Sequence, residues 1–119
     1  MSQIVTPQMI EQKLRALSHE VDQSHKELAE AEQTYFTTKA KYELALAHGR
    51  LSLAGKSDLK LTVSDKADMA LVSAEDLHLQ MGIAEAMVRA ARSNAQRIRT
   101  QVDIARSVGT SVRTSMELS

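Results

Sequence analysis

The sequence predicts an all-α protein, a long antiparallel two-helix hairpin of coiled-coil type that oligomerises into a helical bundle. The first observation is that the 119 residues include one proline and four glycines, so residues that break helices are scarce. The second is that apolar residues recur at alternating steps of four and three over two long stretches. We therefore expect a single domain, residues 1–119, with helices at about 7–54 and 63–116 and a loop at about 55–62.

The first helix is expected to begin at Pro7, with Thr6 as its N-cap, because proline is well tolerated at the first helical position. Ser24 and Thr38 occupy two core positions of its heptad seam, and Gly55 is a suitable stop. The apolar members of this first seam are Ile10, Leu14, Leu17, Val21, Leu28, Ala31, Tyr35, Tyr42 and Ala45.

The second helix is expected to start at a cap formed by Thr62 with Asp65, or by Ser64. Its seam, which we label a and d with Ala67 at a, has sixteen non-polar positions in an unbroken pattern. Because a short loop joins the two helices, they must fold back antiparallel to bury their seams. The second seam consists of Val63, Ala67, Ala70, Ala74, Leu77, Met81, Ala84, Val88, Ala91, Ala95, Ile98, Val102, Ala105, Gly109, Val112 and Met116.

Two helices alone bury little surface, so we expect a second copy to complete the core, most simply in a dimeric four-helix bundle. Near the loop both helices are apolar well beyond the seam, whereas the half near the termini keeps a polar exterior. The expected oligomer interface is Phe36, Leu44, Leu51, Met69, Val72, Leu79, Ile83 and Met87.

Six arginines lie in residues 88–113, and four of them are spaced by seven residues at position e, beside the seam. Guanidinium groups suit phosphate and carboxylate partners, so this row is a candidate edge for binding nucleic acid or an acidic partner. The alternative is solvation, or pairing with the acidic stretch 8–34 or across an oligomer. The candidate residues are Arg89, Arg92, Arg97, Arg99, Arg106 and Arg113.

Catalytic motifs are not apparent, and we expect a non-enzymatic protein without cofactor or metal. The chain has no cysteine. The stretch Gly55-Lys56-Ser57 lacks the earlier glycine of a phosphate-binding loop, and His19-Glu20 lacks the second histidine of a metalloprotease helix. Because no secretory signal or membrane-spanning stretch is visible, we expect a cytoplasmic protein with no membrane partner.

Two stretches, "YELALAHGRLSLAG" and "AEAMVRAARSNAQRIRTQVDIARSVGTSVR", resemble small helical proteins encoded by tailed phages of Gram-positive bacteria. The shared pattern is a helix that ends in a small loop, followed by a long helix that finishes in an Arg-rich segment containing Arg106-Ser107. The resemblance implies a phage origin and a host-cell cytoplasmic location. It implies no specific activity or site residue.

The expected function is that of an oligomeric binding protein that presents the arginine row to DNA, RNA, or a nucleic-acid-processing or host protein. Two alternatives are a purely structural coiled-coil assembly protein and a binder of small phosphorylated ligands at an oligomer interface.

Overall fold

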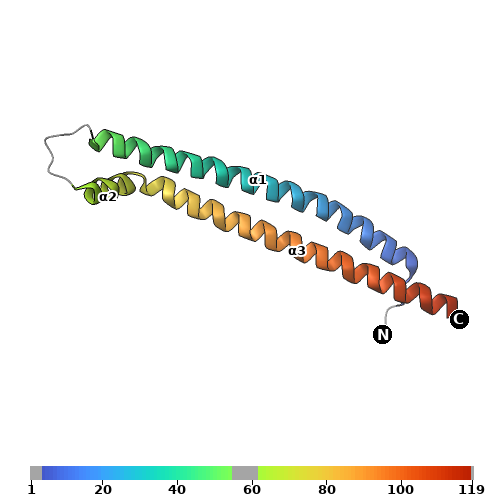
Figure 1. Cartoon of the computed structure of the whole chain (residues 1–119). Coiled ribbons are helices and arrows are strands. Elements are labelled where there is room, and N and C mark those ends of the chain that lie inside the picture. The colour runs from blue at the N-terminus through green and yellow to red at the C-terminus, as the bar shows by residue number, and fades with distance from the viewer. Residues whose placement is uncertain (1–3, 55–61, 119) are drawn as a thin grey trace. The chain divides into compact units, whose positions relative to one another are not determined.

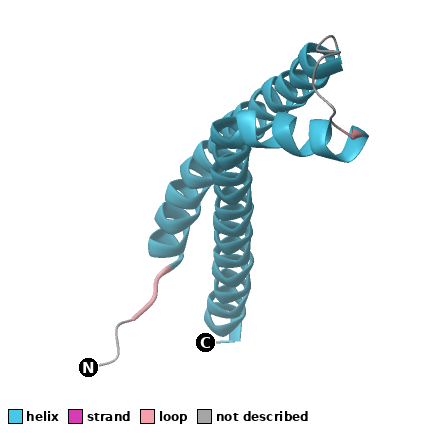
Figure 2. Ribbon diagram, turned by 90° about the vertical axis from the view of Figure 1, so that its left-hand side faces the viewer, coloured by secondary structure: helices cyan, strands magenta, loops and turns pink. Residues whose placement is uncertain are grey.

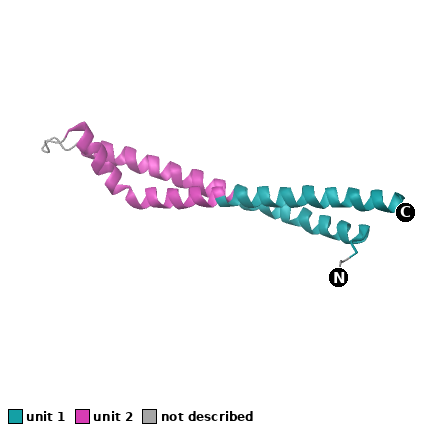
Figure 3. Ribbon diagram, turned by 90° about the horizontal axis from the view of Figure 1, so that it is seen from below, with its two compact units in different colours: residues 1–29, 90–119 teal, residues 30–89 magenta. Residues whose placement is uncertain are grey.

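The computed structural model describes residues 4–54 and 62–118, and every element in these ranges is an α-helix. The helices are α1 (Pro7–Ala54), α2 (Val63–Ser73) and α3 (Glu75–Leu118), as Figure 1 shows. The predicted all-α class is therefore confirmed. The chain divides into two compact units, unit 1 (Met1–Ala29 and Ala90–Ser119) and unit 2 (Glu30–Arg89), coloured teal and magenta in Figure 3.

The start of α1 follows the predicted cap. The Thr6 Oγ1 accepts a hydrogen bond from the Met9 backbone N–H at 3.2 Å, and the Thr6 carbonyl accepts one from the Ile10 N–H at 3.2 Å. Pro7 is the first helical residue, where its missing N–H removes no helical hydrogen bond. The proposed stop at Gly55 and the stretch Gly55-Lys56-Ser57 lie outside the described residues.

A reciprocal cap also opens α2. The Thr62 Oγ1 accepts from the Asp65 N–H at 3.0 Å, and the Asp65 carboxylate accepts from the Thr62 N–H at 3.2 Å. This capping box satisfies two backbone donors that have no partner inside the helix. Of the two caps that the sequence offered for this helix, the structure has Thr62 with Asp65 and not Ser64.

The prediction of one continuous helix over 63–116 is wrong, because the chain leaves helical geometry at Ala74 (φ −99°, ψ 15°). Ala74 donates its N–H to the carbonyls of both Ala70 (3.1 Å) and Leu71 (3.2 Å). The Ser73 hydroxyl also donates to the Ala70 carbonyl, at 2.9 Å, and such competition bends helices. The described chain therefore has three helices, and Figure 2 shows α2 running at an angle to the beginning of α3.

In unit 1 the beginning of α1 packs antiparallel to the end of α3 (Figure 1). Leu17 is fully buried, Ile98 is 3% exposed, and a Cβ built on Gly109 would lie 3.2 Å from the Ile10 side chain. Ser24 is also buried, and its hydroxyl donates to the Val21 carbonyl at 2.8 Å, so its polar group keeps a partner inside the core.

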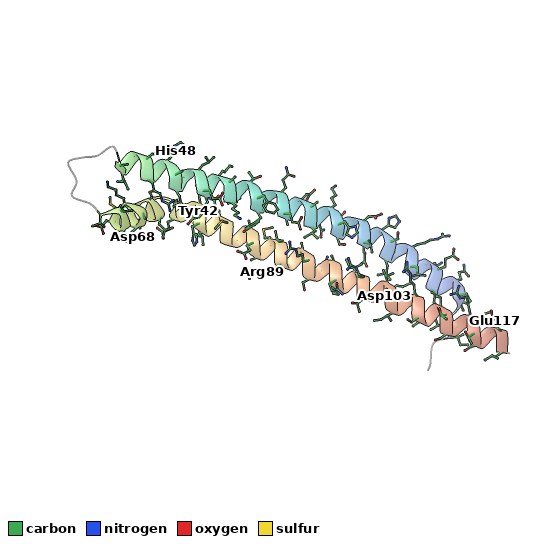
Figure 4. The ribbon with its side chains drawn as sticks, viewed as in Figure 1. Tyr42, His48, Asp68, Arg89, Asp103 and Glu117 are labelled. Carbon is green, nitrogen blue, oxygen red and sulfur yellow. The ribbon has the colours of Figure 1, made fainter. Side chains whose placement is uncertain are left out.

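Unit 2 has a core of small residues. Leu53 of α1 is buried with Ala70, Ala74, Ala84 and Val88 of α2 and α3. A Cβ built on Gly49 would lie 3.0 Å from the Ala70 Cβ, so the backbones of α1 and α2 approach closely there. Farther along, the rings of Tyr42 (labelled in Figure 4) and His78 lie with their centroids 5.3 Å apart.

Burial follows the predicted seams residue by residue. None of the predicted first-seam residues, all of which are described, is exposed, and Ser24 and Thr38 are covered as predicted. Of the sixteen predicted second-seam residues, also all described, the two terminal ones, Val63 and Met116, are exposed. The heptad pattern therefore identifies the inner face of each helix.

Candidate binding edge

Four arginines form one edge of α3 within unit 1, and we call Arg92, Arg99, Arg106 and Arg113 the arginine edge. A spacing of seven residues is nearly two full helical turns, so the four side chains leave the helix in almost the same direction. Their Cα atoms span roughly 31 Å at 1.5 Å per residue. All four side chains are exposed.

The polar contacts along the arginine edge are uneven. Arg92 takes part in an interaction within the chain, and Arg113 donates to the Thr110 hydroxyl at 3.5 Å. The guanidinium groups of Arg99 and Arg106 make no hydrogen bond or ion pair to any residue in the described ranges. Two guanidinium groups in the middle of the edge therefore keep all their donors available for a bound group.

Of the other two candidate arginines, Arg89 belongs to unit 2 and is paired, and Arg97 lies on another side of α3. Arg89 donates to the Glu85 carboxylate one turn earlier at 2.5 Å, and its position is marked in Figure 4. Arg97 donates to the Asn94 side-chain oxygen at 2.9 Å. At 100° per residue, Arg97 lies roughly 160° around α3 from the arginine edge. The six predicted residues therefore do not form one surface.

A groove adjoins the C-terminal half of the arginine edge. Two separate hollows lie there. The hollow of about 770 Å³ is lined by the residues around Thr6 and by the end of α3, and the hollow of about 520 Å³ is lined by Arg106 and Arg113. In the smaller hollow, Gly109 and Thr110 of α3 and the first turns of α1 supply the remaining walls. Gly109 lies against the Ile10 side chain of α1, so α1 approaches α3 closely beside the two arginines.

The nearest acid of α1 in this hollow is held by its own helix. Glu11 lines the hollow, but its carboxylate accepts a hydrogen bond from Arg15 at 2.8 Å. Both partners of this pair are well exposed, so the pair itself contributes little to stability. The hollow thus contains two arginines of α3 and one carboxylate that already has a cation.

A second kind of surface lies on unit 2, where all eight residues of the predicted oligomer interface are exposed. The most exposed are Leu51 (71%) and Val72 (70%), and the least exposed is Met69 (45%). Exposed apolar side chains on a single unit at this density are unusual unless another surface covers them.

The expectation of a polar exterior near the termini is wrong on one side of unit 1. Met9, Ile104 and Val108 are exposed there and line a hollow of about 490 Å³ together with Lys13 and Gln101. Ile104 and Val108 lie at positions c and g, outside the a and d seam of the second helix. Counting apolar residues at these outer positions would have identified this hollow.

Among the residues with a described position, no group of three or more His, Asp or Glu side chains could hold a metal ion. No described helix is long and apolar enough to cross a bilayer.

Comparisons of the chain with models of protein families, with curated proteins and with solved structures found no match. The phage resemblance therefore stays a prediction.

Proposed function

We propose that this protein is a non-enzymatic, oligomeric binding protein whose arginine edge binds the phosphates of a nucleic acid. The observation that carries the proposal is the pair Arg99 and Arg106, exposed on one edge and without a polar partner in the described chain. Arginines in structural roles normally find a carboxylate, as Arg15 and Arg89 do in their own helices.

Charge distribution supports the same proposal. The part of α3 in unit 1 carries five arginines against Asp103 and Glu117, although the whole chain has a formal net charge of zero. Four of these arginines form the arginine edge, and cations concentrated along one edge of a neutral protein attract anionic polymers locally. A phage origin, a host-cell cytoplasmic location and a single folded domain are further parts of the proposal, supported by the sequence pattern alone.

The experiment is a titration of labelled single- and double-stranded DNA and RNA at two salt concentrations. We expect wild-type binding to weaken as salt rises, because each phosphate contact releases a counterion. Replacing Arg99 and Arg106 by Gln removes two such contacts and should reduce the slope of log K against log salt by about 1.8 for double-stranded DNA. Circular dichroism should show unchanged helix content, since neither side chain has a structural partner in the described residues.

The matched control replaces Arg89 and Arg97 by Gln, which changes the net charge by the same amount on the same helix but off the edge. We expect this control to bind nearly as wild type. Equal losses in both variants would show that overall charge, and not the edge, attracts the nucleic acid. No binding at low salt would refute the proposed function.

A second candidate is binding of a small phosphorylated ligand, which the hollow between Arg106 and Arg113 favours. The measurement that distinguishes nucleic-acid binding from small-ligand binding is whether a nucleoside triphosphate displaces bound DNA. The third candidate function is a structural role without any ligand. It predicts an assembly that binds neither the nucleic acid nor the nucleoside triphosphate.

A further inference from the structure

Unit 2 carries two apolar stripes on its outer faces, in addition to the buried seams. The α1 stripe consists of exposed residues spaced by four, four, three and four: Phe36, Ala40, Leu44, Ala47 and Leu51. The α2–α3 stripe follows heptad positions c and f, with Asp76 as its single polar member: Met69, Val72, Asp76, Leu79, Ile83 and Ala86.

These stripes face opposite directions within unit 2. Within α2 and within α3, at 100° per residue, positions c and f lie roughly 160° from the a and d positions of the same helix. Apart from Val63, the seam residues of α1 and of α2–α3 in unit 2 are covered, so the seams turn toward each other, and the residues of both stripes are exposed. One stripe therefore lies on each side of the helix pair. A single two-fold contact between two copies would cover one of these sides and leave the other in water.

Charge favours contact between unlike stripes. Residues 36–54 carry three bases and one acid, a net charge of +2, whereas residues 63–89, the α2–α3 part of unit 2, carry five acids and two bases, a net charge of −3. The acids in the second segment are Asp65, Asp68, Glu75, Asp76 and Glu85. Pairing α1 with α1 or α3 with α3 would bring like charges together, and pairing α1 with α2–α3 brings opposite charges together.

We propose that copies of this chain associate side by side through unit 2, with the α1 stripe of one copy against the α2–α3 stripe of the next. This inference deepens the assembly part of the proposed function and rests on it. The contact is heterologous, so each copy has one free stripe of each kind after a single contact. The assembly then grows beyond two copies, into a ring where the rotation between copies closes and into an open filament where it does not.

The experiment uses two single variants, Leu44→Glu on the α1 stripe and Leu79→Glu on the α2–α3 stripe, studied by light scattering and native mass spectrometry without nucleic acid. We expect wild type to contain more than two chains and each variant alone to be monomeric. Mixing the two variants should yield a complex of one chain of each, because the intact α1 stripe of Leu79→Glu fits the intact α2–α3 stripe of Leu44→Glu.

The masses of the single variants and of their mixture distinguish contact between unlike stripes from contact between like stripes. If each single variant forms its own dimer, like stripes pair and the inference is overturned; a mixture that stays monomeric overturns it as well. A monomeric wild type would refute assembly itself, while leaving the arginine edge to be judged by DNA binding. Circular dichroism checks folding, and Leu44→Gln with Leu79→Gln repeats the test if a glutamate variant unfolds. Ser93→Glu, an exposed position of α3 beyond the stripe, should keep the wild-type mass.

Discussion

Adding one methyl group at Gly49 tests the close approach of α1 and α2 in unit 2. A Cβ at this position would lie 3.0 Å from the Ala70 Cβ, 3.3 Å from the Ala70 Cα and 3.5 Å from the Ser73 Oγ. The nearest atoms belong to or adjoin backbone, so they cannot move aside as the end of a flexible side chain can. Overpacking of this kind costs about 1–3 kcal/mol.

Gly82 supplies the matched control, because a Cβ built there meets nothing within 4 Å. Replacing either glycine by alanine in a helix gains about 1 kcal/mol in helix propensity. That gain is common to both variants, so the difference between them isolates the packing cost of about 1–3 kcal/mol. We expect Gly82→Ala to be more stable than wild type and Gly49→Ala to be less stable or unchanged.

The assay is thermal unfolding followed by circular dichroism at one fixed protein concentration, since assembly makes Tm depend on concentration. A packing cost of this size separates the two Tm values by about 4–12 °C for a chain of this length. A double-mutant cycle with Ala70→Gly should show coupling with Gly49→Ala, because the second change removes the opposing methyl group. If Gly49→Ala and Gly82→Ala raise Tm equally, the two backbones do not approach as described.

Two further substitutions test the core and a cap. Leu17→Ala removes the largest fully buried side chain of unit 1 and should lower the free energy of unfolding by about 2–5 kcal/mol in urea titrations, and a loss below 1 kcal/mol would contradict its burial. Thr62→Ala removes one half of the capping box and should cost about 1 kcal/mol, whereas Thr100→Ala, whose hydroxyl bonds only within an exposed turn, should change stability by less than about 0.5 kcal/mol. Equal effects of the two threonine changes, measured by thermal unfolding, would show that the cap does not stabilise α2.

Much of the fold was predictable because the information is local. Helix start positions depend on residues within one turn, so Thr6 and Thr62 could be identified as caps before the structure was known. The inner face of each helix depends on sequence period alone, and the period placed even Ser24, a polar residue, in the core.

The candidate edge was predictable only in part. Seven-residue spacing places Arg92, Arg99, Arg106 and Arg113 on one side of any helix. Which of these arginines keeps free donors depends on neighbouring side chains, and the structure distinguishes Arg99 and Arg106 from Arg113, which contacts Thr110. The hollow between Arg106 and Arg113 needs the first turns of α1, which are distant in sequence.

By itself the sequence determined that the chain is helical, where α1 begins and which face of each helix is buried, because propensity, capping and periodicity act over a few residues. Only the tertiary structure decided the break at Ala74 and the close approach of Gly49 to Ala70. At the break two donors, the Ala74 N–H and the Ser73 hydroxyl, share the Ala70 carbonyl, and the close approach needs two segments brought together by folding. The spacing of apolar residues does not encode the donors of a carbonyl, because these depend on polar groups within the same turn. It does not encode the distance between two helices either, because that distance depends on atoms that meet only after the chain has packed.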